Sequence, residues 1–122
     1  MTDRKTLKQD YKYLIHPKGV FIIKNIKNGM FYLGSSMNLK GIYDKNKFTL
    51  NLGSHYNKKL QEAWNTFGES AFIYEVLETV ELKEDLNYNY EDDLKILELI
   101  WMDKFNPDSD KSYNKNLKIR VV

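Results

Sequence analysis

The stretch KGVFIIKNIKNGMFYLGSS, residues 18–36, constrains the fold more than any other part of the chain. Two runs of β-branched, aliphatic and aromatic residues, at 20–23 and 30–33, flank the pair Asn28-Gly29. Asn-Gly is a strong signal for a two-residue hairpin turn, because both residues tolerate positive φ. The stretch therefore predicts two antiparallel strands. The second run ends in YLGSS, where Gly34 predicts a sharp turn from the strand into a helix and leaves room for a ligand to approach.

The rest of the chain supplies further helices and one more strand. Residues 56–67 form the clearest helical pattern, because Leu60, Ala63, Trp64 and Phe67 recur at i, i+3, i+4 and i+7 and Gly68 follows. Further helices are expected at residues 38–51 and 91–105, a third strand at 72–77, and an arm or short helix at 1–17. The order predicts an α+β domain built on a small, mostly antiparallel sheet.

Composition narrows the class of protein. The 122 residues suit one globular domain, with 42% hydrophobic and 30% charged residues. The absence of cysteine excludes disulfides, cysteine-ligated zinc and thiol nucleophiles. No apolar stretch is long enough to span a bilayer, and the N-terminal residues are charged rather than those of a secretion signal. We therefore expect a cytoplasmic protein that has no membrane partner.

Charge is unevenly distributed along the chain. Residues 1–61 hold twelve Lys and Arg against three acidic residues, whereas residues 62–110 hold three Lys against fourteen. Residues 111–122 are basic again, although the whole chain has a net charge of only +2. Such segregation predicts a basic face for a polyanion such as nucleic acid. Lysines also decorate solvated surfaces in general, so charge alone does not decide between these readings.

One carboxylate lies in an unusually apolar segment. The stretch ILELIWM, residues 96–102, carries Glu98 as its single charge. On a helix, Glu98 falls within the stripe of Leu94, Leu97, Trp101 and Phe105. An unpaired carboxylate in such a stripe costs several kcal/mol or takes up a proton. It is therefore either a salt-bridge partner or a metal-binding or catalytic carboxylate at the mouth of a cleft.

Several blocks of sequence, taken together, carry a family resemblance. GVF at residues 19–21 and YLG at 32–34 resemble the two halves of the GIY-YIG nuclease motif, and GSSMNLKGIY resembles the segment that follows it. Residues 52–78 resemble the middle block of that family. ELIWMDKFNP, residues 98–107, is similar to its catalytic-glutamate helix, and SYN, residues 112–114, to its closing Gly-Tyr-Asn. The resemblance implies a nuclease domain over residues 18–116, followed by a tail at 117–122.

The resemblance also implies a fold and a site. The fold would be a three-stranded antiparallel sheet flanked by helices, and the activity would be metal-dependent cleavage of DNA phosphodiesters. By position, Glu98 would hold one divalent ion, Mg²⁺ or Mn²⁺, and Tyr32 would orient or deprotonate the attacking water. Asn114 would buttress the site, and His55 falls where some members carry a histidine. No small-molecule cofactor is implied.

Two positions depart from the family pattern. Phe21 stands where the first motif ends in Tyr, and Ile42 stands where the family carries an Arg eight residues after the glycine of YIG. Phenylalanine cannot accept a proton, and isoleucine cannot clamp a phosphate oxygen. We expect nearby residues to replace the missing hydroxyl group and the missing positive charge. The candidates are Tyr43 for the phenol and Lys40, Lys45 or Lys47 for the cation.

Three functions remain open at this stage. The first is a divergent metal-dependent DNA endonuclease. The second is a GIY-YIG-fold module that binds DNA with little or no catalysis, which the two departures favour. The third is a protein-interaction domain that uses the acidic loop of residues 81–90, with Tyr88 and Tyr90 as the contact. For the first two, we expect a DNA-binding face that carries Tyr32 together with Lys24, Lys40, Lys45, Lys47, Lys58 and Lys59.

Overall fold

The computed structural model describes residues 16–105 and 111–114, and its centre is a three-stranded sheet. The strands are β1 (Gly19–Asn25), β2 (Phe31–Ser36) and β3 (Phe72–Thr79), in the order β2-β1-β3. Both pairings with β1 are antiparallel. The Asn25 N–H donates to the Met30 carbonyl, so the hairpin loop contains residues 26–29 and is longer than the predicted two-residue turn, with Gly29 at a φ of 75°. The predicted α+β class with an antiparallel sheet is confirmed.

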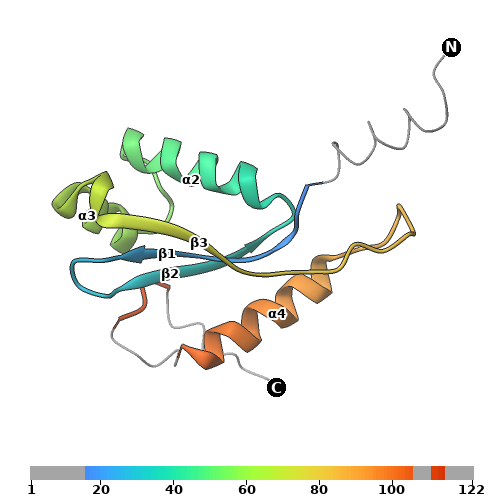
Figure 1. Cartoon of the computed structure of the whole chain (residues 1–122). Coiled ribbons are helices and arrows are strands. Elements are labelled where there is room, and N and C mark those ends of the chain that lie inside the picture. The colour runs from blue at the N-terminus through green and yellow to red at the C-terminus, as the bar shows by residue number, and fades with distance from the viewer. Residues whose placement is uncertain (1–15, 106–110, 115–122) are drawn as a thin grey trace, which may run out of the picture.

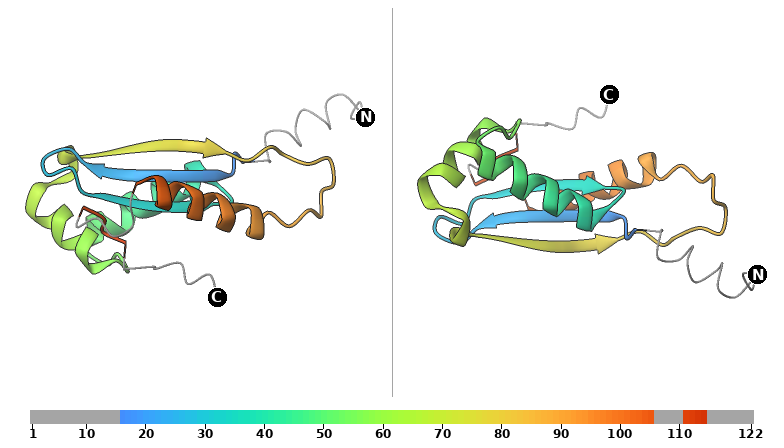
Figure 2. Two further views of the ribbon diagram at one scale, coloured as in Figure 1. Left: turned by 90° about the horizontal axis from the view of Figure 1, so that it is seen from below. Right: turned by 90° about the horizontal axis from the view of Figure 1, so that it is seen from above.

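Helices cover both faces of this sheet. They are α2 (Leu39–Leu52), α3 (Lys58–Phe67) and α4 (Glu91–Lys104), with a short 3₁₀ turn, η1 (Glu69–Ala71), before β3. Figure 1 shows α2 on one side of the sheet and α4 on the other, and the two views of Figure 2 look onto these opposite sides. Helices were predicted at residues 38–51, 56–67 and 91–105. Their predicted ends lie within two residues of the observed ones.

Strand alternation divides the interior into two cores. Side chains of a strand point alternately to its two faces, so Phe21 and Ile23 of β1 face one way and Val20 and Ile22 face the other. The first core, on the side of α2 and α3, contains Phe21, Ile23, Tyr32, Leu39, Leu50, Leu60, Ala63 and Tyr113. The second core, on the side of α4, contains Val20, Ile22, Phe31, Leu33 and Met102.

Asparagines begin the two helices on the first face. The side chain of Asn38 accepts a hydrogen bond from the Gly41 N–H, and that of Asn57 accepts one from the Leu60 N–H. Each bond satisfies one of the N–H groups that the first turn of a helix leaves without a backbone partner. These caps mark where α2 and α3 begin.

Gly34 does not make the predicted turn. It is paired within β2, opposite Phe21, and the strand continues to Ser36. A Cβ atom built on Gly34 would lie 2.8 Å from Cζ of Phe21, closer than real Cβ contacts. Any larger residue here would force the buried phenyl ring of the neighbouring strand to shift, and the chain turns only after Ser36.

The segment 111–114 runs beside the outer edge of β2. Ser112 forms a parallel bridge with Phe31, and the Tyr113 N–H donates to the Phe31 carbonyl at 2.7 Å. The predicted arm at 1–17 and tail at 117–122 lie almost wholly or wholly outside the described residues. In the part of the chain that is described, no helix has the length and apolar character needed to cross a bilayer.

Candidate active site

A cavity of about 480 Å³ lies at the outer edge of β2. Its walls come from β2, from α2, from the connection between α2 and α3, from α4 and from the segment 111–114. Tyr32, His55, Glu98 and Asn114, which four separate segments supply, all line it. The structure thus brings together the four residues that the sequence singled out, although their chemical roles remain predictions.

The edge position of β2 explains how both faces of the sheet reach one cavity. Tyr32 points toward the first core, whereas Ser35, three residues later, points toward α4. No further strand covers β2 on its outer side in the described sheet. Side chains from α2 above and α4 below can therefore meet around this edge.

Glu98 reaches the cavity from α4. Its Oε2 accepts a hydrogen bond from Oγ of Ser35 at 2.7 Å, and the residue is half-buried. Leu97 and Trp101 pack into the second core, so Glu98 lies beside the apolar stripe rather than inside it. Among the described residues, no cation forms an ion pair with this carboxylate. Within the described residues, the salt-bridge reading therefore has no support, and no hydrogen bond to the other oxygen of this carboxylate is found there.

Tyr32 is 6% exposed, and its hydroxyl forms a hydrogen bond with the hydroxyl of Tyr56. The Tyr56 ring is 77% exposed and stacks on the imidazole of His55, with centroids 4.7 Å apart. The residue as a whole is exposed, but desolvation of its hydroxyl, followed by the charge of Glu98, raises the pKa of Tyr56. Sequence reasoning missed Tyr56, and its only signal was an aromatic residue in a polar connection next to His55.

Both ring nitrogens of His55 are engaged. The Asn57 N–H donates to Nδ1 at 3.0 Å, and Nε2 lies 2.6 Å from Oδ1 of Asn46. The Asn46 amide nitrogen donates to the Ile42 carbonyl, so its oxygen faces the histidine and Nε2 must be the donor. Burial lowers the pKa of His55. The histidine is therefore neutral, and each of its ring nitrogens already has a hydrogen-bond partner. This arrangement suits a structural role in the cavity wall rather than proton transfer.

Asn114 acts on the backbone of β2. Its Oδ1 accepts from the Leu33 N–H at 2.9 Å, and its Nδ2 donates to the Leu33 carbonyl at 2.7 Å. The side chain thus replaces the neighbouring strand that the edge of β2 lacks. It fixes Leu33 between Tyr32 and Gly34, which matches the expected buttressing position.

The six lysines expected on one face are dispersed. Lys45 alone of the six lines the cavity. Lys24 is paired with Phe31, which faces the second core, so it lies on the face opposite Tyr32. Lys40 precedes the cavity-lining Ile42 by two residues and projects from the other side of α2.

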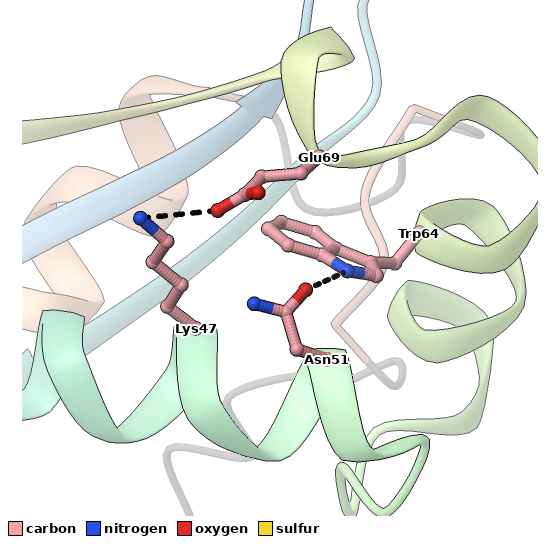
Figure 3. Close-up of polar contacts among 4 residues, drawn as sticks. All are labelled: Lys47, Asn51, Trp64 and Glu69. Atoms are coloured by element: carbon pink, nitrogen blue, oxygen red, sulfur yellow. Dashed lines mark hydrogen bonds and ion pairs between the residues drawn. The ribbon is translucent and has the colours of Figure 1, made fainter.

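The remaining three lysines also stay outside the cavity wall. Figure 3 shows Lys47 bound to Glu69, with Nζ and Oε1 3.0 Å apart. Beside this pair, Asn51 accepts a hydrogen bond from Trp64, which ties α2 to α3. Lys58 and Lys59 are exposed in the first turn of α3. The expected basic face around Tyr32 is therefore wrong for Lys24, and DNA contact by the six remains a prediction.

Two other aromatic candidates are already engaged. The ring of Tyr43 packs against Tyr74 at 4.6 Å, away from the cavity, so it does not replace the missing phenol. In the acidic loop, Tyr90 is buried and its hydroxyl accepts the Lys83 N–H, while Tyr88 donates to Asp93. These tyrosines therefore do not form the free aromatic surface that a protein-interaction role would use.

Comparison with known proteins relates the fold to one nuclease family. No protein-family model and no curated protein matches the sequence. Among solved structures, the catalytic domain of the homing endonuclease I-TevI superposes with a TM-score of 0.65 and 27% identity, over 80% of this chain and 96% of that one. The chain is a structural relative of the GIY-YIG endonucleases. A glutamate-to-alanine variant of the same domain gives a TM-score of 0.67 and 24% identity, covering 80% and 92% of the two chains.

The structure shows where the two residues that depart from the GIY-YIG pattern lie. Phe21 and Ile42 both line the cavity, so this site has an apolar wall where the family pattern has a phenol and a guanidinium. Lys45, one turn after Ile42, supplies a cation in the same wall. Tyr56 supplies a second phenol beside Tyr32.

The donor set suits a hard divalent cation bound mainly by water and substrate. Within residues 16–105 and 111–114, no three His, Asp or Glu side chains gather into a metal cluster. Glu98 is the single carboxylate in the cavity wall. Mg²⁺ commonly binds through one or two carboxylates together with waters and substrate phosphates. The residues of the cavity wall therefore fit the divalent cation that the GIY-YIG resemblance implies.

Proposed function

We propose that the chain is a metal-dependent DNA endonuclease of divergent GIY-YIG type. The observation that carries this proposal is the meeting of Tyr32, Glu98, His55 and Asn114 in one cavity, within a fold that matches an endonuclease catalytic domain. These residues come from distant parts of the sequence, so no local constraint brings them together. DNA enters as the substrate because the matched structures belong to a homing endonuclease.

Each residue has a role that its surroundings support. Glu98, held by Ser35, would bind Mg²⁺ or Mn²⁺, and the ion would stabilise negative charge on the phosphate. The Tyr32 oxygen, once ionised, would take a proton from the attacking water. Lys45 would meet the phosphate charge in place of the missing arginine. His55 and Asn114 would hold the two sides of the cavity in place.

A cleavage assay on supercoiled and branched DNA, with Mg²⁺ or Mn²⁺, tests the proposal. Glu98→Gln should reduce cleavage by about 10² or more, because the carboxylate that holds the metal is lost. Glu91→Gln is the matched control, since Glu91 is exposed in the first turn of the same helix. Equal cleavage by the Glu98→Gln variant and the wild type would contradict the assignment.

Metal binding can be checked without DNA cleavage. Crystals soaked in Mn²⁺ should show anomalous density beside Glu98 in the wild type and none in Glu98→Gln. Absence of density at high Mn²⁺ concentration would count against a metal-dependent reaction.

A second candidate is a DNA-binding module with little catalysis. The observation that favours it is the apolar wall that Phe21 and Ile42 give the cavity. This candidate predicts that labelled DNA binds, as measured by fluorescence anisotropy, without being cut under any metal condition. Cleavage that depends on Glu98 would exclude it.

A further inference from the structure

We propose that Tyr56 is a positioning residue for Tyr32, which it holds by a hydroxyl–hydroxyl hydrogen bond and primes to accept a proton. The inference rests on the proposed nuclease function for its catalytic meaning. The cavity wall contains two tyrosines, Tyr32 and Tyr56, and Phe21 contributes no hydroxyl. The hydroxyl group next to Tyr32 thus comes from a residue that lies outside both halves of the GIY-YIG-like motif.

The two phenols approach the cavity from different elements. Tyr32 is anchored in β2, and its ring packs near Phe21 with centroids 6.2 Å apart. Tyr56 belongs to the connection between α2 and α3, and its exposed ring rests on His55. Because Asn46 and Asn57 fix both nitrogens of His55, the support beneath Tyr56 is itself rigid. The hydrogen bond therefore joins two parts of the cavity wall, β2 and the connection between α2 and α3, that other contacts already hold in place.

The protonation state of Tyr32 decides which hydroxyl donates: either can donate while both phenols are neutral, and only Tyr56 can once the Tyr32 oxygen is ionised. The charged or titratable groups that share the cavity wall with the two phenols are Lys45 from α2, His55 from the connection and Glu98 from α4. A phenol ionises near pH 10, and desolvation of the Tyr56 hydroxyl raises its pKa further, so Tyr56 retains its proton at neutral pH. It then donates to the Tyr32 oxygen, and a donated hydrogen bond stabilises the ionised form of the acceptor.

In the proposed reaction, the proton balance is simple. The Tyr32 hydroxyl first loses its proton to solvent, and the ionised oxygen then takes one proton from the attacking water, whose oxygen forms a bond to phosphorus. The bond from phosphorus to the leaving oxygen breaks, and that oxygen takes a proton from solvent. Tyr56 keeps its own proton throughout, and its contribution is to stabilise and orient the Tyr32 oxygen that acts as the base.

A titration without DNA tests the pairing directly. The full chain labelled with difluorotyrosine, whose phenols ionise near neutral pH, is followed by fluorine NMR, and the Tyr32 signal is assigned by its loss in Tyr32→Phe. In Tyr56→Phe, Tyr32 should ionise at a pH higher by half a unit or more. Tyr88→Phe, which removes a phenol bonded to Asp93 in the acidic loop, should leave it unchanged. An unchanged Tyr32 titration in Tyr56→Phe overturns the proposal.

Cleavage kinetics test the catalytic meaning separately. Tyr56→Phe should lower kcat at least tenfold at neutral pH, shift the rise of rate to higher pH, and leave DNA affinity within twofold. A wild type that fails to cleave overturns the proposed function, while the titration still decides whether the phenols are coupled. A shifted titration with unchanged kcat and pH profile overturns the positioning role alone.

Discussion

His55 is the residue whose environment is most completely defined. Asn57 and Asn46 satisfy its two nitrogens, and a second proton on Nδ1 would face the Asn57 N–H that now donates to it. Protonation must therefore break one of these hydrogen bonds within a buried site. This single side chain links the stability of the cavity wall to pH.

The expected consequence is a loss of stability in mild acid. The unfolded chain takes up a proton near the ordinary histidine pKa of 6.5, whereas the folded chain does so only at lower pH. The unfolded state thus binds more protons in this window, and the free energy of unfolding falls as pH drops below about 6.5. Urea denaturation from pH 8 to 5 should show this fall in the wild type.

The His55→Gln variant should lose part of that pH dependence. It should also be less stable at pH 7 by about 1–3 kcal/mol, because buried hydrogen-bond partners are left unsatisfied. His16→Gln, which removes the other, exposed histidine, should keep the wild-type pH dependence. Identical pH profiles for the wild type and His55→Gln would contradict the buried, neutral assignment.

The sequence predicted the site residues better than their roles. Tyr32, Glu98 and Asn114 stand in segments whose order and spacing can be recognised, so their identity could be read directly. Tyr56 was missed because a hydrogen bond between residues 24 positions apart leaves no periodic pattern. The saturation of His55 was equally hidden, since it depends on how Asn46 is turned by the Ile42 carbonyl.

Among the elements, β2 carries Tyr32 and Ser35 and depends on unusual support. Its outer edge is held by the backbone of the segment 111–114 and by the side chain of Asn114. On its inner side, Gly34 accommodates the ring of Phe21. Two predictions follow from these contacts, one for each side of the strand.

Removal of the Asn114 amide should loosen the outer edge of β2. In Asn114→Ala, the Leu33 N–H loses its acceptor, at a cost of about 1 kcal/mol. Amide hydrogen exchange at Leu33 should then be about five- to tenfold faster by NMR. The amide of Ile22, in the central strand, should be less affected, and equal acceleration at both amides would indicate a global rather than a local effect.

Addition of a methyl group at Gly34 should strain the inner side. Gly34→Ala places a Cβ 2.8 Å from Cζ of Phe21, whose ring is buried and cannot move away freely. We expect a loss of about 1–3 kcal/mol in the free energy of unfolding. Phe21→Leu removes the ring tip, so the double variant should be more stable than additivity predicts by at least about 0.5 kcal/mol in a double-mutant cycle. Strict additivity would contradict the contact.

The elements themselves were largely predictable. The helical repeat of residues 60–67 depends on local sequence and placed its helix correctly. Asn28-Gly29 placed the reversal of the chain but not its length, because Asn25 already pairs with Met30. The end of β2 was misplaced because Gly34 has a long-range cause, the ring of Phe21 on the neighbouring strand. The sequence alone does not show whether a glycine forms a turn or leaves space for a neighbouring side chain.

For the whole molecule, charge along the sequence proved a weak guide to charge in space. The basic first half of the chain supplies β1 and α2, which direct lysines to different sides. Lys24 lies on the face opposite Tyr32, Lys47 is bound to Glu69, and Lys45 stands in the cavity wall. A strand alternates its faces every residue and a helix turns by 100° per residue, so a basic segment does not make a basic face.

Salt dependence of DNA binding distinguishes these lysines. A lysine that contacts a phosphate releases a counterion, and its loss reduces the slope of log K against log salt concentration by about 0.9. Lys45→Met should therefore weaken binding and lower the slope by about one, because Lys45 lines the cavity. Lys40→Met, on the same helix but its opposite side, and Lys24→Met, on the opposite face of the sheet, are matched controls that should leave the slope unchanged.

Fluorescence anisotropy at salt concentrations between 50 and 200 mM, roughly the range over which such contacts lose affinity most visibly, gives the slopes. Equal effects of the three substitutions would mean that DNA lies across the molecule without entering the cavity at the edge of β2.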